Sequence, residues 1–254
     1  MECEWLEAGF YIISGGKSPE RATCLLPERI VTVSTCIVES YPDSWALPWA
    51  ATTSDELRQI QALLGLKDSE FAELRSWVLR AMDDEKFGWP DVFFSLNAAR
   101  EFRHRFLTAV KDTRILGLSL ARDVAEEFLR DEAPQEGHGG SGVWTMLRRG
   151  AQLNRPASPL GFDVLGAEYG GAFHTFSCNG LEQDFNKKLG ITFNRYGLID
   201  DYPTAITASK YTNQDDVGAE PVAWYPFRVD DYSTEGLANM PLKLSVGRGR
   251  PPAA

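Results

Sequence analysis

The stretch that decides the fold class is residues 53–82, TSDELRQIQALLGLKDSEFAELRSWVLRAM. Its apolar residues recur every three or four positions, which is the period of an amphipathic helix. Thr53 with Glu56 three residues later matches a capping box, and Gly65 is typical of a helix end. We therefore expect one helix between Thr53 and Gly65, and a second that begins at or just after Asp68.

The segments on either side of this stretch have the composition of β-strands. We expect strands at residues 9–14, 29–38, 114–119, 160–165 and 220–229. Pro226 in the last segment has no backbone N–H, so it confines that strand to an edge or a bend. Strands and helices mix without strict alternation, and the predicted fold is α+β. The sheet is expected to be mixed or antiparallel, with a helical segment inserted around residues 54–131.

Further helices are expected at four places. They run from near Asn97 to residue 110, over 121–132, from Asn179 to residue 188, and from Asp201 or Thr204 to residue 211.

A glycine-rich loop between the third and fourth predicted strands separates two regions of the chain. Residues 134–142, around His138, contain four glycines and are predicted to be a linker or a flap. The two regions are 1–133 and 142–235, unless they form one continuous domain, and 247–254 is predicted to be a disordered tail.

The charge balance favours a basic protein partner over a nucleic acid or a membrane. The chain has 26 basic and 36 acidic residues, a formal net charge of -10, which repels phosphate backbones and anionic lipids. Its four cysteines form no CxxC pair and its three histidines have no metal-site spacing, so we expect neither a metal nor a cofactor. There is no signal peptide and no apolar run of membrane-spanning length, so the expected location is cytoplasmic.

One cluster of residues has the composition of a thiol active site. Cys178 is the candidate nucleophile, His174 the candidate base and Asp163 the residue that would orient the histidine. The alternative is structural, with Cys178 a small buried residue and His174 a hydrogen-bonded strand residue. The glycines of residues 166–171 lack the Gly-Lys-Ser/Thr of a phosphate loop and favour a hairpin connection.

The last sixty residues combine carboxylates with aromatic rings, as a surface that docks a basic protein would. The predicted partner-binding residues are Asp200, Asp201, Tyr202, Asp215, Asp216, Trp224, Tyr225, Asp230 and Asp231. In the alternative interpretation the rings belong to the core and the aspartates to turns, which favour that residue.

Four segments resemble a set of uncharacterised bacterial cytosolic proteins over roughly residues 55–232. They are FGWPDVF at 87–93, GFDVLG at 161–166, FHTFSCNGLE at 173–182 and YGLIDD at 196–201. In size and acidity such proteins are similar to the immunity partners of secreted bacterial toxins. The resemblance implies a protein without enzymatic activity that binds and neutralises a basic toxin domain. A cysteine-dependent hydrolase or transferase using Cys178 and His174 is the alternative, and a ligand-sensing module near the glycine-rich stretch is a third.

Overall fold

The computed structural model describes residues 3–18, 24–47, 52–136, 140–153, 159–168 and 172–233. The predicted tail at 247–254, and His138 in the predicted glycine-rich loop, lie outside these ranges. The expectations for these two segments therefore stay predictions.

Within the described ranges, eight strands form one sheet whose pairings are all antiparallel, which confirms the α+β class. The strand order is β3-β4-β1-β5-β8-β6-β7, and β2 also pairs with β1. The bounds are β1 Trp5–Gly15, β2 Val38–Tyr41, β3 Phe87–Gly88, β4 Val92–Phe93, β5 Arg114–Ala121, β6 Pro159–Glu168, β7 Ala172–Thr175 and β8 Ala223–Asp231.

The helices begin and end largely where the capping residues predict. Their bounds are α1 Ser54–Leu64, α2 Asp68–Asp83, α3 Leu96–Phe106, α4 Arg122–Asp131, α5 Gly142–Arg149, α6 Glu182–Leu189 and α7 Tyr202–Thr212. Thr53 and Glu56 form the predicted capping box of α1, and Gly65 ends that helix in the left-handed conformation. The predicted insert around 54–131 thus contains α1 to α4, but it also contains the strands β3, β4 and β5.

Three local predictions need correction. Most of residues 29–38 is not a strand, since β2 begins only at Val38 and the Val31 N–H donates to the Tyr196 carbonyl, 2.9 Å away, in a distant loop. Ser95, rather than Asn97, caps α3, because the Ser95 side chain accepts from the Ala98 N–H. Asn179 ends the short 3-10 helix η2, Phe176–Asn179, instead of capping α6, which begins three residues later.

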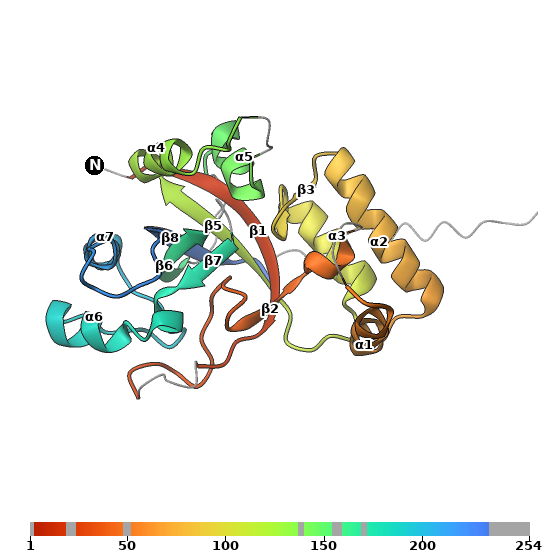
Figure 1. The fold of residues 1–254 in the computed structure, drawn as a ribbon, viewed down its shortest axis with the longest axis horizontal. Helices are drawn as coiled ribbons and strands as arrows, with labels where there is room; N and C mark the ends of the chain where they lie inside the picture. The colour runs from red at the N-terminus through yellow and green to blue at the C-terminus, as the bar shows by residue number, and fades with distance from the viewer. Residues whose placement is uncertain are drawn as a thin grey trace, which may run out of the picture.

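The helices cover both faces of the sheet, and alternate residues of β1 face different helices. Tyr11 belongs to the core cluster that contains Phe128 of α4 and Met146 of α5. Ile12 belongs to the cluster that contains the buried residues of α1, α2 and α3. In Figure 1, β1 curves through the middle of the molecule, with α1 to α3 on one side and α6 and α7 on the other.

Strand β8 joins the two regions of the chain, because it lies between β5 and β6. Pro226 pairs with Val164 of β6, but the pairing with β5 ends at Arg228, opposite Ser119. At Pro226, β8 therefore pairs with β6 alone, and the missing N–H of the proline lies on the unpaired side of the strand. The prediction that Pro226 lies at an edge is confirmed at this position.

Candidate functional site

The hairpin of β6 and β7 holds a histidine against a carboxylate. Gly166 pairs with His174 and Glu168 pairs with Ala172, which confirms the predicted hairpin. Residues that are diagonal neighbours on one face of an antiparallel ladder are within reach of each other. His174 Nε2 accordingly lies 3.0 Å from Glu168 Oε2.

The other nitrogen of this histidine faces a thiol that is 138 residues away in sequence. Cys36 Sγ lies 3.5 Å from His174 Nδ1. Cys36 is exposed and lies in the turn before β2, where the N–H groups of Ile37 and Val38 both donate to the Ser34 carbonyl. The turn therefore presents the thiol at the surface, with the imidazole between it and Glu168.

A second carboxylate approaches the same imidazole. Glu220 Oε1 lies 3.8 Å from His174 Nδ1, and Asn179 Oδ1 accepts the Glu220 backbone N–H at 3.2 Å. A carboxylate oxygen therefore lies within 4 Å of each nitrogen of this imidazole. A thiol, a histidine and an orienting carboxylate are the minimal set for nucleophilic catalysis by cysteine.

The predicted nucleophile, Cys178, is not the thiol that faces the histidine. Its Sγ lies 3.4 Å from Ser34 Oγ, and the residue is partly buried. Burial raises the pKa of the Cys178 thiol to about 12, and the neighbouring Cys36 raises it too, against the lowering effect of the Ser34 hydrogen bond. Cys178 is therefore protonated at neutral pH, and Cys36 replaces it in the candidate site.

Asp163, the predicted orienting residue, lies on the other face of the sheet. Residues along a strand alternate between faces, so Gly166 shares the face of His174 and Asp163 does not. Asp163 Oδ1 instead accepts a hydrogen bond from Thr175 Oγ1 at 2.8 Å. The carboxyl is 1% exposed, and this burial raises its pKa from 3.8 to about 7. Glu168, rather than Asp163, is the carboxylate that contacts the imidazole of His174.

An open hollow lies beside the histidine. It has a volume of about 570 Å³ and is lined by His174, Glu168, Glu220 and Glu132 together with residues 221–223 and Ala167. The described part of its lining contains three carboxylates and neither lysine nor arginine. A neutral or positively charged molecule is therefore favoured there over an anion.

The predicted partner-binding residues do not form one surface, because some of them are exposed and others are buried in the core. Trp224 is 1% exposed and Tyr225 is 3% exposed, so neither ring is on a surface that a partner can reach. Tyr202 is half-buried, with its ring centroid 4.9 Å from that of Trp5. These rings contribute to the core, as the alternative interpretation held.

The predicted carboxylates lie in three separate places. Asp200 and Asp201 are exposed before α7, where the Asp201 side chain accepts from the Thr204 N–H as the predicted N-cap. Asp215 and Asp216 are exposed after the C-terminus of the same helix. An 11-residue helix spans roughly 16 Å, so the two pairs are separated by about that length.

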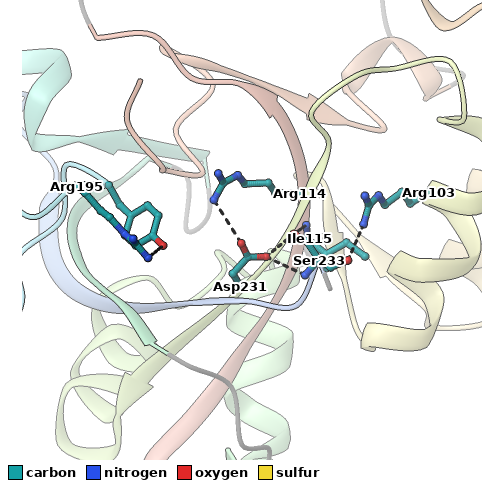
Figure 2. A network of polar contacts seen from close by, with 7 residues as sticks. Arg103, Arg114, Ile115, Arg195, Asp231 and Ser233 are labelled. Atoms are coloured by element: carbon teal, nitrogen blue, oxygen red, sulfur yellow. Dashed lines mark hydrogen bonds and ion pairs between the residues drawn. The ribbon is translucent and has the colours of Figure 1, made fainter. Parts of the chain in front are cut away.

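The third pair of aspartates is held by arginines. Asp230 is 1% exposed, and its Oδ1 is 2.8 Å from Arg228 Nη2. Figure 2 shows Asp231 between Arg114 and Ser233, with Asp231 Oδ2 3.4 Å from Arg114 Nη1. The Ser233 backbone N–H also donates to Asp231 Oδ1 at 2.8 Å. Asp230 is therefore buried in an ion pair, and the charge of Asp231 is partly compensated.

Neither a metal site nor a membrane-spanning helix is found among the residues that the structure describes. Within them, no group of three or more histidine, cysteine, aspartate or glutamate side chains is placed to hold a metal ion. None of the helices in the same ranges is long and apolar enough to cross a bilayer.

Compared with family models, with curated proteins and with solved structures, the chain matches none. The resemblance to immunity proteins therefore stays a prediction, and the site is interpreted from its own geometry.

Of the three residues in this chain of contacts, the sequence predicts only His174 as a site residue, and its role as a base stays a prediction. The hairpin that the glycines indicate places Glu168 diagonally opposite His174, so the spacing of these two residues carries a usable signal. Cys36 had no such signal, because a contact across 138 residues depends on the tertiary fold.

Proposed function

We propose that this protein is a cysteine-dependent hydrolase or transferase of acyl groups, with Cys36 as the nucleophile. The observation that carries the proposal is the chain of contacts from Cys36 Sγ to His174 Nδ1, 3.5 Å, and from His174 Nε2 to Glu168 Oε2, 3.0 Å. His174 and Glu168 also line an open hollow, which leaves the imidazole accessible from the surface, although Cys36 is not among the residues that line it. His174 is the base, and Glu168 positions the imidazole.

The proposed reaction proceeds in two steps. His174 Nδ1 takes the thiol proton while Cys36 Sγ forms a bond to the carbonyl carbon, and the leaving group departs with a proton from the imidazolium. Water or another acceptor then attacks the thioester, giving its proton to His174, and the thiol is restored. Glu168 stabilises the imidazolium that forms in each step. The carboxylates around the hollow favour neutral or cationic acyl donors.

The test uses p-nitrophenyl acetate as a general acyl donor. We expect release of p-nitrophenolate and an acetyl adduct on Cys36 by peptide mass spectrometry. Cys36→Ala removes both signals, whereas Cys24→Ser, which changes another exposed thiol, leaves them unchanged.

The histidine and the carboxylate have separate signatures in this assay. His174→Asn lowers acylation by about 100-fold or more, the usual contribution of a general base. Glu168→Gln shifts the pH profile of acylation, which a purely structural residue does not do. Equal acylation of Cys36 and Cys24, or unchanged acylation in His174→Asn, contradicts the proposal.

A second candidate function is that of an immunity-type protein that binds and neutralises a basic toxin. The exposed aspartate pairs at both ends of α7 and the net charge of -10 favour this function, because they attract a positively charged partner. Co-expression with a toxin encoded beside its gene tests it. We expect protection by the wild type, and less protection by the Asp200→Asn/Asp201→Asn/Asp215→Asn/Asp216→Asn variant.

The two candidate functions are separable by one variant. Cys36→Ala abolishes acyl transfer but leaves protection intact if the protein acts by binding alone. Protection that persists in Cys36→Ala and disappears in the four-aspartate variant would replace catalysis by inhibition. Both functions suit the cytoplasm, which we propose as the location because its reducing conditions keep Cys36 as a free thiol.

A further inference from the structure

A second cavity lies next to the turn that joins β3 and β4. Its volume is about 190 Å³, and its walls include Tyr11 of β1, Phe173 of β7, and Trp89 and Asp91 of the turn. Phe173 faces this cavity while the next residue, His174, faces the open hollow, so the two sites lie on different sides of β7. The FGWPDVF segment noted in the sequence forms this turn.

The first feature that points to a ligand is Tyr11. This residue is 3% exposed, and its hydroxyl is buried. The hydroxyl has no hydrogen-bond partner in the described parts of the protein. A buried hydroxyl without a partner is unfavourable, since it has given up its hydrogen bonds with water. A molecule in the cavity can supply the missing hydrogen bond.

The second feature is Asp91, a carboxyl in the wall of the same cavity. Asp91 is 9% exposed, and its backbone has a φ of 54°, a left-handed conformation that is uncommon outside glycine. Burial raises the pKa of Asp91 well above its usual range, and the negative charge of Asp43 raises it further. Among the residues that the structure describes, the wall of this cavity contains neither lysine nor arginine.

The third feature is Trp89, which forms part of the wall and is 38% exposed. Tryptophan is the side chain that attracts cations most strongly through the face of its ring.

We infer that this cavity binds a small organic cation, an alkylammonium or alkylguanidinium group, which pairs with Asp91 and hydrogen-bonds to the Tyr11 hydroxyl beside the Trp89 ring. The cation supplies the positive charge that the wall lacks and the partner that Tyr11 lacks. The volume of about 190 Å³ limits the ligand to a small molecule. The inference is independent of the proposed acyl transfer.

Binding of the cation has a chemical signature. Burial raises the pKa of Asp91 well above its usual range, and pairing with a cation favours the ionised form of the carboxyl. Cation binding is therefore expected to lower this pKa and to release protons to the buffer. Among the described residues, the other titratable groups that line this cavity are Tyr11 and Asp43. Burial raises the pKa of Tyr11 well above its usual range, so its hydroxyl stays neutral.

The test is isothermal titration calorimetry at neutral pH with four probes of similar size. These are n-propylammonium, methylguanidinium, neutral propionamide and anionic propionate. We expect saturable binding of at least one of the two cations, with proton release that appears as a dependence of the heat on the buffer. Propionamide and propionate are expected to bind at least about tenfold more weakly, because neither forms an ion pair with Asp91.

Variants of the wall separate the proposal from weak nonspecific binding. Asp91→Asn weakens cation binding by at least about tenfold and abolishes proton release, and Tyr11→Phe weakens it less. Asp216→Asn, outside the cavity, is the matched control for a lost charge. If Asp91→Asn does not fold, Trp89→Leu on the exposed part of the wall replaces it, with several-fold weaker binding expected. Binding of neither cation, equal binding of propionamide, or unchanged affinity in these variants overturns the inference.

Discussion

At the scale of single residues, Asp163 makes the stability of the protein depend on pH. The unfolded chain loses this proton near pH 3.8, whereas burial holds the pKa of the folded carboxyl at about 7. Between these values the unfolded chain binds fewer protons than the folded protein. The contribution of Asp163 to the free energy of unfolding therefore falls as pH rises through this window. The fall is at most roughly 4 kcal/mol.

Asp163→Asn is expected to remove that fall. Urea unfolding from about pH 4 to about pH 7 measures the difference between the wild type and the variant at each pH. Asp216→Asn, an exposed aspartate, serves as the control and is expected to keep the slope of the wild type. Parallel stability curves for the wild type and Asp163→Asn would show that the buried carboxyl does not titrate in this window.

The residues of the candidate site differ in how far sequence predicts them. His174 and Glu168 belong to one hairpin, so local pattern and strand pairing bring them together. Cys36 and Cys178 are both near the histidine, and only the fold decides which thiol faces it, because their local sequences contain no catalytic signature. Burial, which keeps Cys178 protonated, is likewise a property of the folded chain.

At the scale of elements, helices whose ends carry strong local signals were predicted well. The capping box of α1, the Asp201 cap of α7 and the glycine after α6 act through hydrogen bonds within a few residues. Residues 29–38 were predicted wrongly as a strand, since their apolar side chains pack against the core without regular strand pairing. Val31, for example, is buried and donates its N–H to a distant loop.

Strand β1 depends on a glycine at its irregular point. Gly9 has a φ of 116° and lies where the register with β5 shifts, and a Cβ there would clash with Val92 Cγ1. Gly9→Ala is therefore expected to lower the free energy of unfolding by about 3 kcal/mol. Gly150→Ala, at a left-handed position with open space around it, is the matched control and is expected to lose about 1 kcal/mol.

Chemical denaturation of the two variants measures this difference. The comparison isolates the clash, because both positions have positive φ and only Gly9 is crowded. Equal losses in the two variants would mean that β1 shifts to accommodate the added methyl group.

At the scale of the whole molecule, a single sheet contains strands from both predicted regions. Strands β1 and β5 come from residues 1–133, and β6, β7 and β8 come from residues 142–235. The ladder between β5 and β8 joins them through Leu116 to Ser119. Neither region can complete this sheet without the other. We therefore expect the two predicted regions to form one continuous domain.

The expected consequence is a single unfolding transition. Far-ultraviolet circular dichroism and the fluorescence of the seven tryptophans should give the same midpoint in urea. Two separated transitions would indicate that the regions on either side of the glycine-rich loop unfold independently.

The two outermost strands of the sheet path are short: β3 has two residues and β7 has four. A long free edge offers a row of unpaired backbone groups to a strand of another molecule, which is a common route to aggregation. These short borders offer few such groups. We therefore expect these two edges of the sheet to contribute little to the growth of intermolecular fibrils.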